Sequence, residues 1–227
     1  MSLTNYKLCT MLWVLLSCMH LHTLQAAGTA HTYCLMLDPA GDAEHTGRRL
    51  EHNFERGLTL QCAERIKQEL EQRLPHVRVV LTRSAGQTAE PLQHAQFANR
   101  LRADLYIGLY MYRQEGTRSV WSIYRFSSGQ HVPYNMQEPC FLHYDQAYQK
   151  CNAETECIAN TLYTLLHAQS MSTHFFDIRK PCALLHAGLI GIARPAVALE
   201  MGLVHDDTWQ QCAMILVDAI QALVGTA

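Results

Sequence analysis

Apolar residues in this chain alternate between short continuous runs and longer stretches with helical spacing. The short runs predict strands at residues 33–37, 77–82, 104–112, 120–126 and 196–200. Helical spacing predicts helices at 54–74, 91–101, 154–167 and 208–224, the last with Asp206 or Asp207 placed to cap it. Strands separated by helices indicate a single α/β domain whose mainly parallel sheet carries helices on both faces.

Polar residues gather where three of the predicted strands end. The first strand runs into a small, polar and acidic loop at 38–47 (DPAGDAEHTG), another ends around Tyr110, and a third ends at Glu200. Ligands bind beyond the carboxyl ends of the strands in sheets of this kind. We therefore expect a functional site at these three places.

The first 27 residues have the parts of a secretory signal peptide. A single Lys7 precedes a short apolar run, and the segment ends in small residues at Ala26 and Ala27. The tetrapeptide LLSC at 15–18 also resembles a lipoprotein box, which would place cleavage before Cys18 and leave a lipid anchor. A first helix of the domain is the alternative. We expect export to the periplasm or cell envelope, with residues 28–227 as the domain and membrane contact only through such an anchor.

Composition narrows the function classes. The 227 residues carry 18 Lys+Arg against 20 Asp+Glu, and 48% of them are apolar, which is typical of a folded chain. No basic run is present, so nucleic acid is not an expected partner. An irregular polar insert at about 127–152 interrupts the strand and helix pattern and contains Cys140 and Cys151.

Five segments in order resemble the motifs of one enzyme family. They are DPAGDAEHTG, FERGLTLQCAERIKQEL, VVLTR, HAQFANRLRADLYIGLY and RPAVALEMG. This series is similar to the zinc-dependent N-acetylmuramoyl-L-alanine amidases, the third amidase family of bacterial cell-wall hydrolases. The resemblance runs from about Tyr33 to the C-terminus, apart from the insert. It implies an amidase-like α/β domain, one zinc ion held by two His and one Glu, and a second Glu that activates water to hydrolyse the amide between muramic acid and L-alanine.

Matched one by one, the family's site residues are only partly present. The two His ligands fall on Gly41 and Tyr110, so both imidazoles are missing. The Glu ligand falls on Glu55 and the catalytic Glu on Glu200, and both are retained. An arginine of the family pattern falls on His94.

Three further residues belong to the predicted substrate groove. Arg83 and Asn99 match the family pattern, and Tyr110 has both a core and a sugar-stacking interpretation. A carboxylate at the end of an apolar strand needs a partner, and Arg83 or Arg194 is the expected partner of Glu200.

The missing imidazoles change the functional prediction. Glycine offers no ligand, and a phenol with a pKa of about 10 binds zinc only after an unfavourable deprotonation. One carboxylate alone should not hold zinc. We therefore predict a degenerate member of the fold that binds peptidoglycan or muropeptides, or regulates cell-wall hydrolysis, without a cofactor.

Two other hypotheses remain open at this point. Asp42 or His45, together with His52 and Glu55, could rebuild a zinc site if the helix starts early, and Glu200 would then move the proton of an active amidase. Alternatively, the chain is a structural envelope protein whose insert binds another envelope protein.

Overall fold

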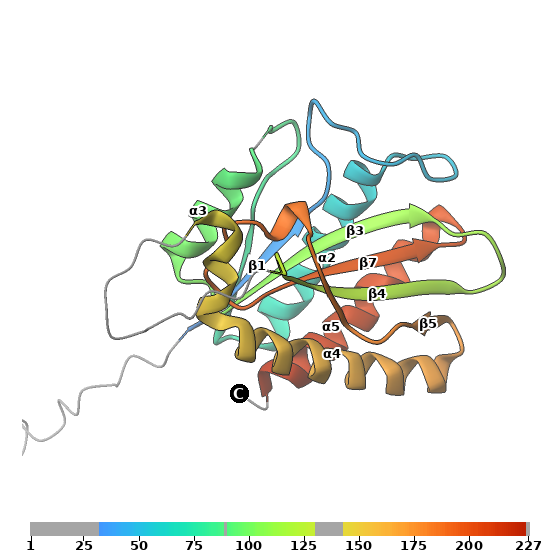
Figure 1. Ribbon diagram of the computed structural model, residues 1–227. Coiled ribbons are helices and arrows are strands. Elements are labelled where there is room, and N and C mark those ends of the chain that lie inside the picture. Colours follow the sequence, from blue (N-terminus) through green and yellow to red (C-terminus); the bar gives the residue numbers. More distant parts are fainter. Residues whose placement is uncertain (1–31, 89, 130–142, 226–227) are drawn as a thin grey trace, which may run out of the picture. The chain divides into compact units, whose positions relative to one another are not determined.

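The computed structural model describes residues 32–88, 90–129 and 143–225 (Figure 1). Its strands are β1 (Tyr33–Pro39), β2 (Val77–Leu81), β3 (Leu105–Arg113), β4 (Ser119–Phe126), β5 (Phe176–Ile178), β6 (Cys182–Leu184) and β7 (Ala196–Leu203). Its helices are α2 (Glu55–Arg73), α3 (Pro91–Leu101), α4 (Asn152–Thr173) and α5 (Trp209–Gly225), and 3-10 turns occur at η1 (Tyr144–Cys151), η2 (Ala187–Leu189) and η3 (Asp206–Thr208). The predicted signal peptide, its Cys18 and residues 130–142 of the insert lie outside the described residues.

The strands form one mixed sheet in the order β2-β1-β3-β7-β4-β5, with β6 also paired to β4. All pairings are parallel except that of β4 with β7. The predicted α/β class and mainly parallel sheet are therefore confirmed. In the β3–β7 pair, Tyr110 lies directly opposite Glu200, so two of the predicted site positions are neighbours across the ladder.

Helices lie on both faces of the sheet, in unequal number. The larger core contains apolar side chains of α2, α4 and α5 packed on one face, and Figure 1 shows these three helices together along one side of the strands. The smaller core joins α3 to the opposite face through Ala95 and Ala98. No helix in the described part of the chain combines the length and the apolar composition needed to cross a membrane.

The predicted elements agree with the structure to within a few residues, with three exceptions. Helix α4 is longer than predicted and ends at Thr173, and the short strands β5 and β6 were not predicted. Strands of three residues carry too few side chains to show an alternating pattern. Of the two candidate caps of α5, Asp206 is engaged elsewhere, because its carboxylate accepts hydrogen bonds from the backbone of Glu51 and His52 and from the Asn53 amide.

Candidate functional site

An arginine joins the two retained glutamates at the carboxyl edge of the sheet. Glu55 is the first residue of α2 and Glu200 lies in β7, while Arg48 comes from the loop between β1 and α2. The Arg48 Nη1 donates to Glu200 Oε1 at 2.5 Å, and its Nη2 donates to Glu55 Oε1 at 2.9 Å. The guanidinium therefore lies between the carboxylates that the family resemblance assigns to the metal and to the attacking water.

The Glu55 carboxylate has no free acceptor position. Oε1 accepts from Arg48 Nη2 and from the backbone N–H of Met111, both at 2.9 Å. Oε2 accepts from the backbone N–H of Arg48 at 2.9 Å and from its Nε at 3.2 Å. A carboxylate offers about four lone-pair sites, so these four bonds fill it. The backbone of residue 47 can lie this close to the Glu55 carboxylate only because it is a glycine, since a Cβ on Gly47 would lie 2.7 Å from Glu55 Oε2.

Arg48 carries a permanent positive charge in this place. Burial alone would lower the pKa of its guanidinium, but hydrogen bonds and charges of Glu55 and Glu200 outweigh burial and raise it. The guanidinium also lies over the Tyr112 ring, 5.4 Å from its centroid. A zinc ion bound to Glu55 would have to displace this cation and break its bonds to both carboxylates.

Tyr110, which the family resemblance matches to the second histidine ligand, is packed as a neutral phenol. Its ring meets the His186 ring edge to face at 4.8 Å between centroids. Its hydroxyl lies against Gly188, and a Cβ added to Gly188 would lie only 1.9 Å from the Tyr110 hydroxyl oxygen. Burial, with the negative charges of Asp38 and Glu55, raises the pKa of Tyr110 above its ordinary value. The residue is therefore neutral and unsuited to binding zinc.

The position of the first missing imidazole, Gly41, has its own local geometry. Its φ is +76°, and an added Cβ would lie 2.7 Å from the Cβ of Arg56 and 3.0 Å from the His45 carbonyl oxygen. A residue with a side chain would be strained there and would also clash. The loop is shaped for glycine.

The predicted substitute ligands do not come together. Asp42 and His45 contact each other, with 3.2 Å between Oδ1 and Nδ1, and both line a pocket of about 450 Å³ that also includes Tyr110. His52 is exposed, with its Nε2 3.9 Å from Glu51 Oε1, and lines a different hollow. It precedes α2, which begins only at Glu55, so the early helix start that would place His52 beside Glu55 is not found. Among the described residues, no group of three or more His, Cys, Asp or Glu side chains is arranged to hold a metal. The residues present here do not fit zinc.

The other predicted groove residues hold backbone segments in place. Arg83 is buried and donates to the carbonyls of Pro39 and Ala40 and to one in α2. The Asn99 amide bridges backbone groups of residues 191 and 193. The prediction that Arg83 or Arg194 pairs with Glu200 is wrong, because Arg48 makes that pair.

Sequence analysis missed three residues of the site: Arg48, Tyr124 and His186. Tyr124 donates its hydroxyl to Glu200 Oε2 at 3.1 Å, and the His186 ring stacks beside the Tyr124 ring. Burial lowers the pKa of His186, so its imidazole is neutral. No local pattern could have identified these residues, since Arg48 and Tyr124 reach Glu200 across 152 and 76 positions of sequence.

A second buried carboxylate lies at the end of β1. Asp38 accepts hydrogen bonds from the hydroxyls of Thr82 and Tyr106, each at 2.5 Å, and its Oδ1 lies 2.9 Å from His94 Nδ1. Burial would raise the pKa of Asp38, but the contacts with His94, Thr82 and Tyr106 lower it. Burial would lower the pKa of His94, but Asp38 raises it. The two side chains therefore form an ion pair beneath the site.

Several solved structures resemble the described domain. The catalytic domain of CwlV, an N-acetylmuramoyl-L-alanine amidase from Bacillus (Paenibacillus) polymyxa var. colistinus, is 17% identical with a TM-score of 0.60, over 86% of this chain and 99% of that one. The amidase Ami1 from Mycobacterium smegmatis is 16% identical with a TM-score of 0.59, over 86% and 97%. The CwlD amidase from Clostridioides difficile, in complex with the GerS lipoprotein, is 11% identical with a TM-score of 0.58, over 86% and 100%.

Sequence comparison adds nothing further. No protein-family model and no curated protein sequence matches this chain. At 11–17% identity the structural likeness establishes the fold, and the family resemblance noted in the sequence is confirmed at that level. The described domain has the fold of the N-acetylmuramoyl-L-alanine amidase catalytic domains.

Proposed function

We propose that this protein binds peptidoglycan or muropeptides, or regulates their hydrolysis, without hydrolysing them itself. The observation that carries the proposal is the Arg48 guanidinium between Glu55 and Glu200. Arginine supplies the charge that compensates these carboxylates, but it has no open coordination position and binds no water as a Lewis acid. Glu200 keeps its place without an activated water to serve.

The site retains features suited to binding. A guanidinium has five N–H donors, and Arg48 uses three of them on the two carboxylates, which leaves two for a ligand. Its side chain is 41% exposed. The half-exposed rings of Tyr112 and Tyr124 flank Glu200 and could stack on a sugar ring. Carbonyl oxygens of an N-acetyl group or a peptide would accept hydrogen bonds from the two free N–H groups of Arg48.

The proposed location follows from the same reasoning. The N-terminal 27 residues support export to the periplasm or cell envelope, with a lipid anchor if cleavage precedes Cys18. The resemblance to CwlD, whose structure contains a lipoprotein partner, supports an envelope protein as a further partner of this fold. Binding to such a partner would suit a regulatory role.

Zinc content and muropeptide binding, measured on the same purified protein, test the proposal. The protein is exposed to zinc, cleared of loosely held metal and analysed, and muropeptides are then added to detect binding and released peptide. We expect no retained zinc, measurable binding and no hydrolysis, with binding weakened by Arg48→Gln and unchanged by Arg49→Gln. About one zinc per chain together with chelator-sensitive release of L-alanine-linked peptides would overturn the proposal and favour the rebuilt amidase.

A further inference from the structure

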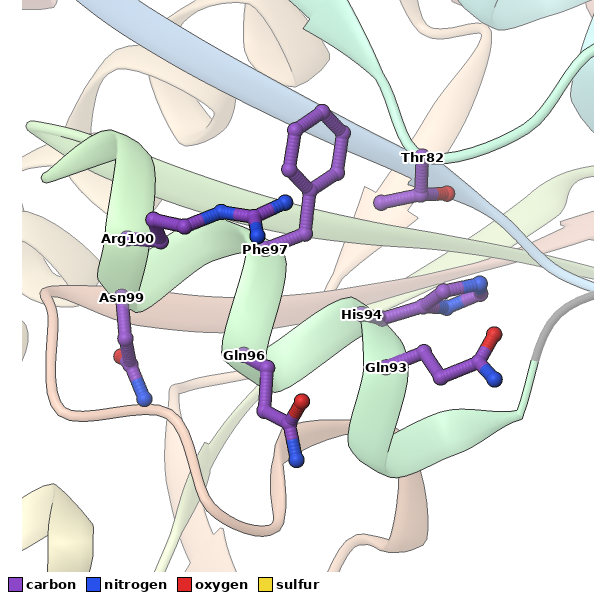
Figure 2. Close-up of a pocket in the computed structure, with 7 residues that line it drawn as sticks. All are labelled: Thr82, Gln93, His94, Gln96, Phe97, Asn99 and Arg100. Atoms are coloured by element: carbon purple, nitrogen blue, oxygen red, sulfur yellow. The ribbon is translucent and has the colours of Figure 1, made fainter.

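A further hollow lies beside helix α3. Its volume is about 820 Å³, and it is lined by Thr82 and six residues of α3: Gln93, His94, Gln96, Phe97, Asn99 and Arg100. Figure 2 shows the His94 and Phe97 rings projecting from the helix on the side of Thr82, with the Arg100 side chain extending along the helix toward Phe97. None of these residues is Arg48, Glu55 or Glu200, and His94 also lines the pocket of about 450 Å³ beside Tyr110.

Arg100 brings a positive charge to this hollow. Arg100 is exposed and makes no ion pair within the described part of the chain, and none of the seven lining residues is acidic. Residues 94, 97 and 100 are spaced by three, so they share one side of α3. An anionic group of a ligand could therefore reach the guanidinium without displacing an internal partner.

His94 adds a second polar group to the same wall. Its Nδ1 faces the buried Asp38 carboxylate, and its Nε2 is buried with no hydrogen-bond partner among the described residues. A buried ring nitrogen without a partner is unfavourable and unusual in a folded protein. Contact with Asp38 favours the imidazolium, in which Nε2 carries a proton to donate. An oxygen of a bound ligand would satisfy it.

The rest of the lining fits a hydroxylated ring. Phe97 is partly buried and offers an aromatic ring, while the amides of Gln93 and Gln96 are exposed and make no hydrogen bond within the described residues. Amides can donate to and accept from hydroxyl groups, and an aromatic ring packs against the C–H face of a sugar. Asn99 is already bound to the backbone of residues 191 and 193 and only shapes the wall.

We propose that the α3 hollow binds an acidic saccharide, with the carboxylate on Arg100, an oxygen on His94 Nε2 and the sugar ring on Phe97. This site goes beyond the proposed function, because it uses none of the residues on which peptidoglycan binding at Glu200 depends. It stands if that function fails.

Titration of the full chain with sodium glucuronate and with glucose, followed by NMR, tests the site. These sugars differ by the carboxylate, so we expect glucuronate to shift the signals of α3 and glucose to bind at least about tenfold more weakly. Arg100→Gln should weaken glucuronate binding about tenfold, whereas Arg102→Gln, an exposed change two residues away outside the hollow, should leave it unchanged.

Four results would overturn the proposal. The first three are equal binding of the two sugars, no shift of α3 signals by glucuronate, and equal effects of the two arginine substitutions. Inorganic phosphate at the same ionic strength is the remaining probe. If phosphate displaces glucuronate at equal concentration, the hollow is a plain anion site and the saccharide assignment is wrong; if phosphate is much weaker, the sugar ring contributes as proposed.

Discussion

The retained and the replaced positions of the amidase pattern have different surroundings. At the retained carboxylates, Glu55 and Glu200, a cation joins the two: Arg48 donates four hydrogen bonds, three to Glu55 and one to Glu200. At the replaced positions no new charge bridges the site, and neighbouring residues have instead adapted in shape. The cluster is thus centred on an arginine whose guanidinium binds both carboxylates.

The replaced positions show this adaptation in detail. Gly41 has a left-handed backbone conformation and lies close to Arg56, and the hydroxyl of Tyr110 contacts Gly188. His94, at the position of an arginine in the family pattern, is the cationic partner of the buried Asp38, and its charge depends on pH. Replacing any one of these residues by the family's side chain should therefore not restore the family's chemistry.

The largest effect is expected from removing the new cation. Arg48→Met leaves Glu55, which is 4% exposed, without its counter-ion and should lower the free energy of unfolding by about 3 kcal/mol. Urea denaturation measures the change. Arg49→Met is the matched control, because Arg49 is exposed and makes no ion pair within the described residues, and it should change stability by less than about 0.5 kcal/mol. Equal denaturation midpoints for wild type and Arg48→Met would show that the guanidinium is dispensable.

Restoring the first imidazole should cost stability without recovering metal. Gly41→His places a side chain at φ +76° and 2.7 Å from Arg56, so we expect a loss of about 2–3 kcal/mol. Gly86→His is matched in backbone strain, with φ +78°, but meets nothing within 4 Å and should lose only about 1 kcal/mol. Metal analysis of Gly41→His combined with Tyr110→His should show no tight zinc. One zinc per chain in that double variant would mean that Arg48 yields to the metal.

The fit of Tyr110 on Gly188 predicts a smaller loss. Gly188→Ala forces its Cβ against the Tyr110 hydroxyl and should destabilise the protein by about 1–2 kcal/mol in urea denaturation. Tyr110→Phe removes that oxygen and should recover part of the loss when combined with it. Gly57→Ala, in α2 with nothing within 4 Å, should be neutral or stabilising. No recovery in the double variant would argue against the contact.

The smallest effect should depend on pH. The folded pKa of His94 is raised, so its contribution to stability is complete below the unfolded value of 6.5 and is lost as pH rises through the folded value. The folded pKa of Asp38 is lowered, so its contribution is present above 3.8 and is lost as pH falls through the folded value.

The measurement compares wild type and His94→Gln at pH 5.5 and pH 8.5. Wild type should be more stable by on the order of 1 kcal/mol at the lower pH, and the advantage should shrink at the higher one. His76→Gln changes an exposed histidine and should show no such dependence. An advantage that grows with pH would contradict the ion pair.

Sequence patterns predicted most of the fold and only the outline of the site. Helix α2 shows its buried face in Leu58, Cys62, Ile66 and Leu70, all of which are buried in the structure. Tyr110 and Glu200 were expected at one edge of the sheet and are paired across β3 and β7. The partner of Glu200 was assigned wrongly, because the arginine that reaches it comes from a loop without a periodic pattern.

The sequence by itself determined the order of the longer strands and the helices, the parallel character of most of the sheet and the absence of two imidazoles, because these depend on local spacing and on residue identity. Only the tertiary structure decided that β4 runs antiparallel beside β7, that Tyr124 donates to Glu200 with the His186 ring stacked beside it, and that Arg48 joins two carboxylates. Those contacts depend on strand register and loop path over long sequence separations. The charge of the site therefore depends on the tertiary structure, because the fold decides which charged side chains come within hydrogen-bond distance of one another.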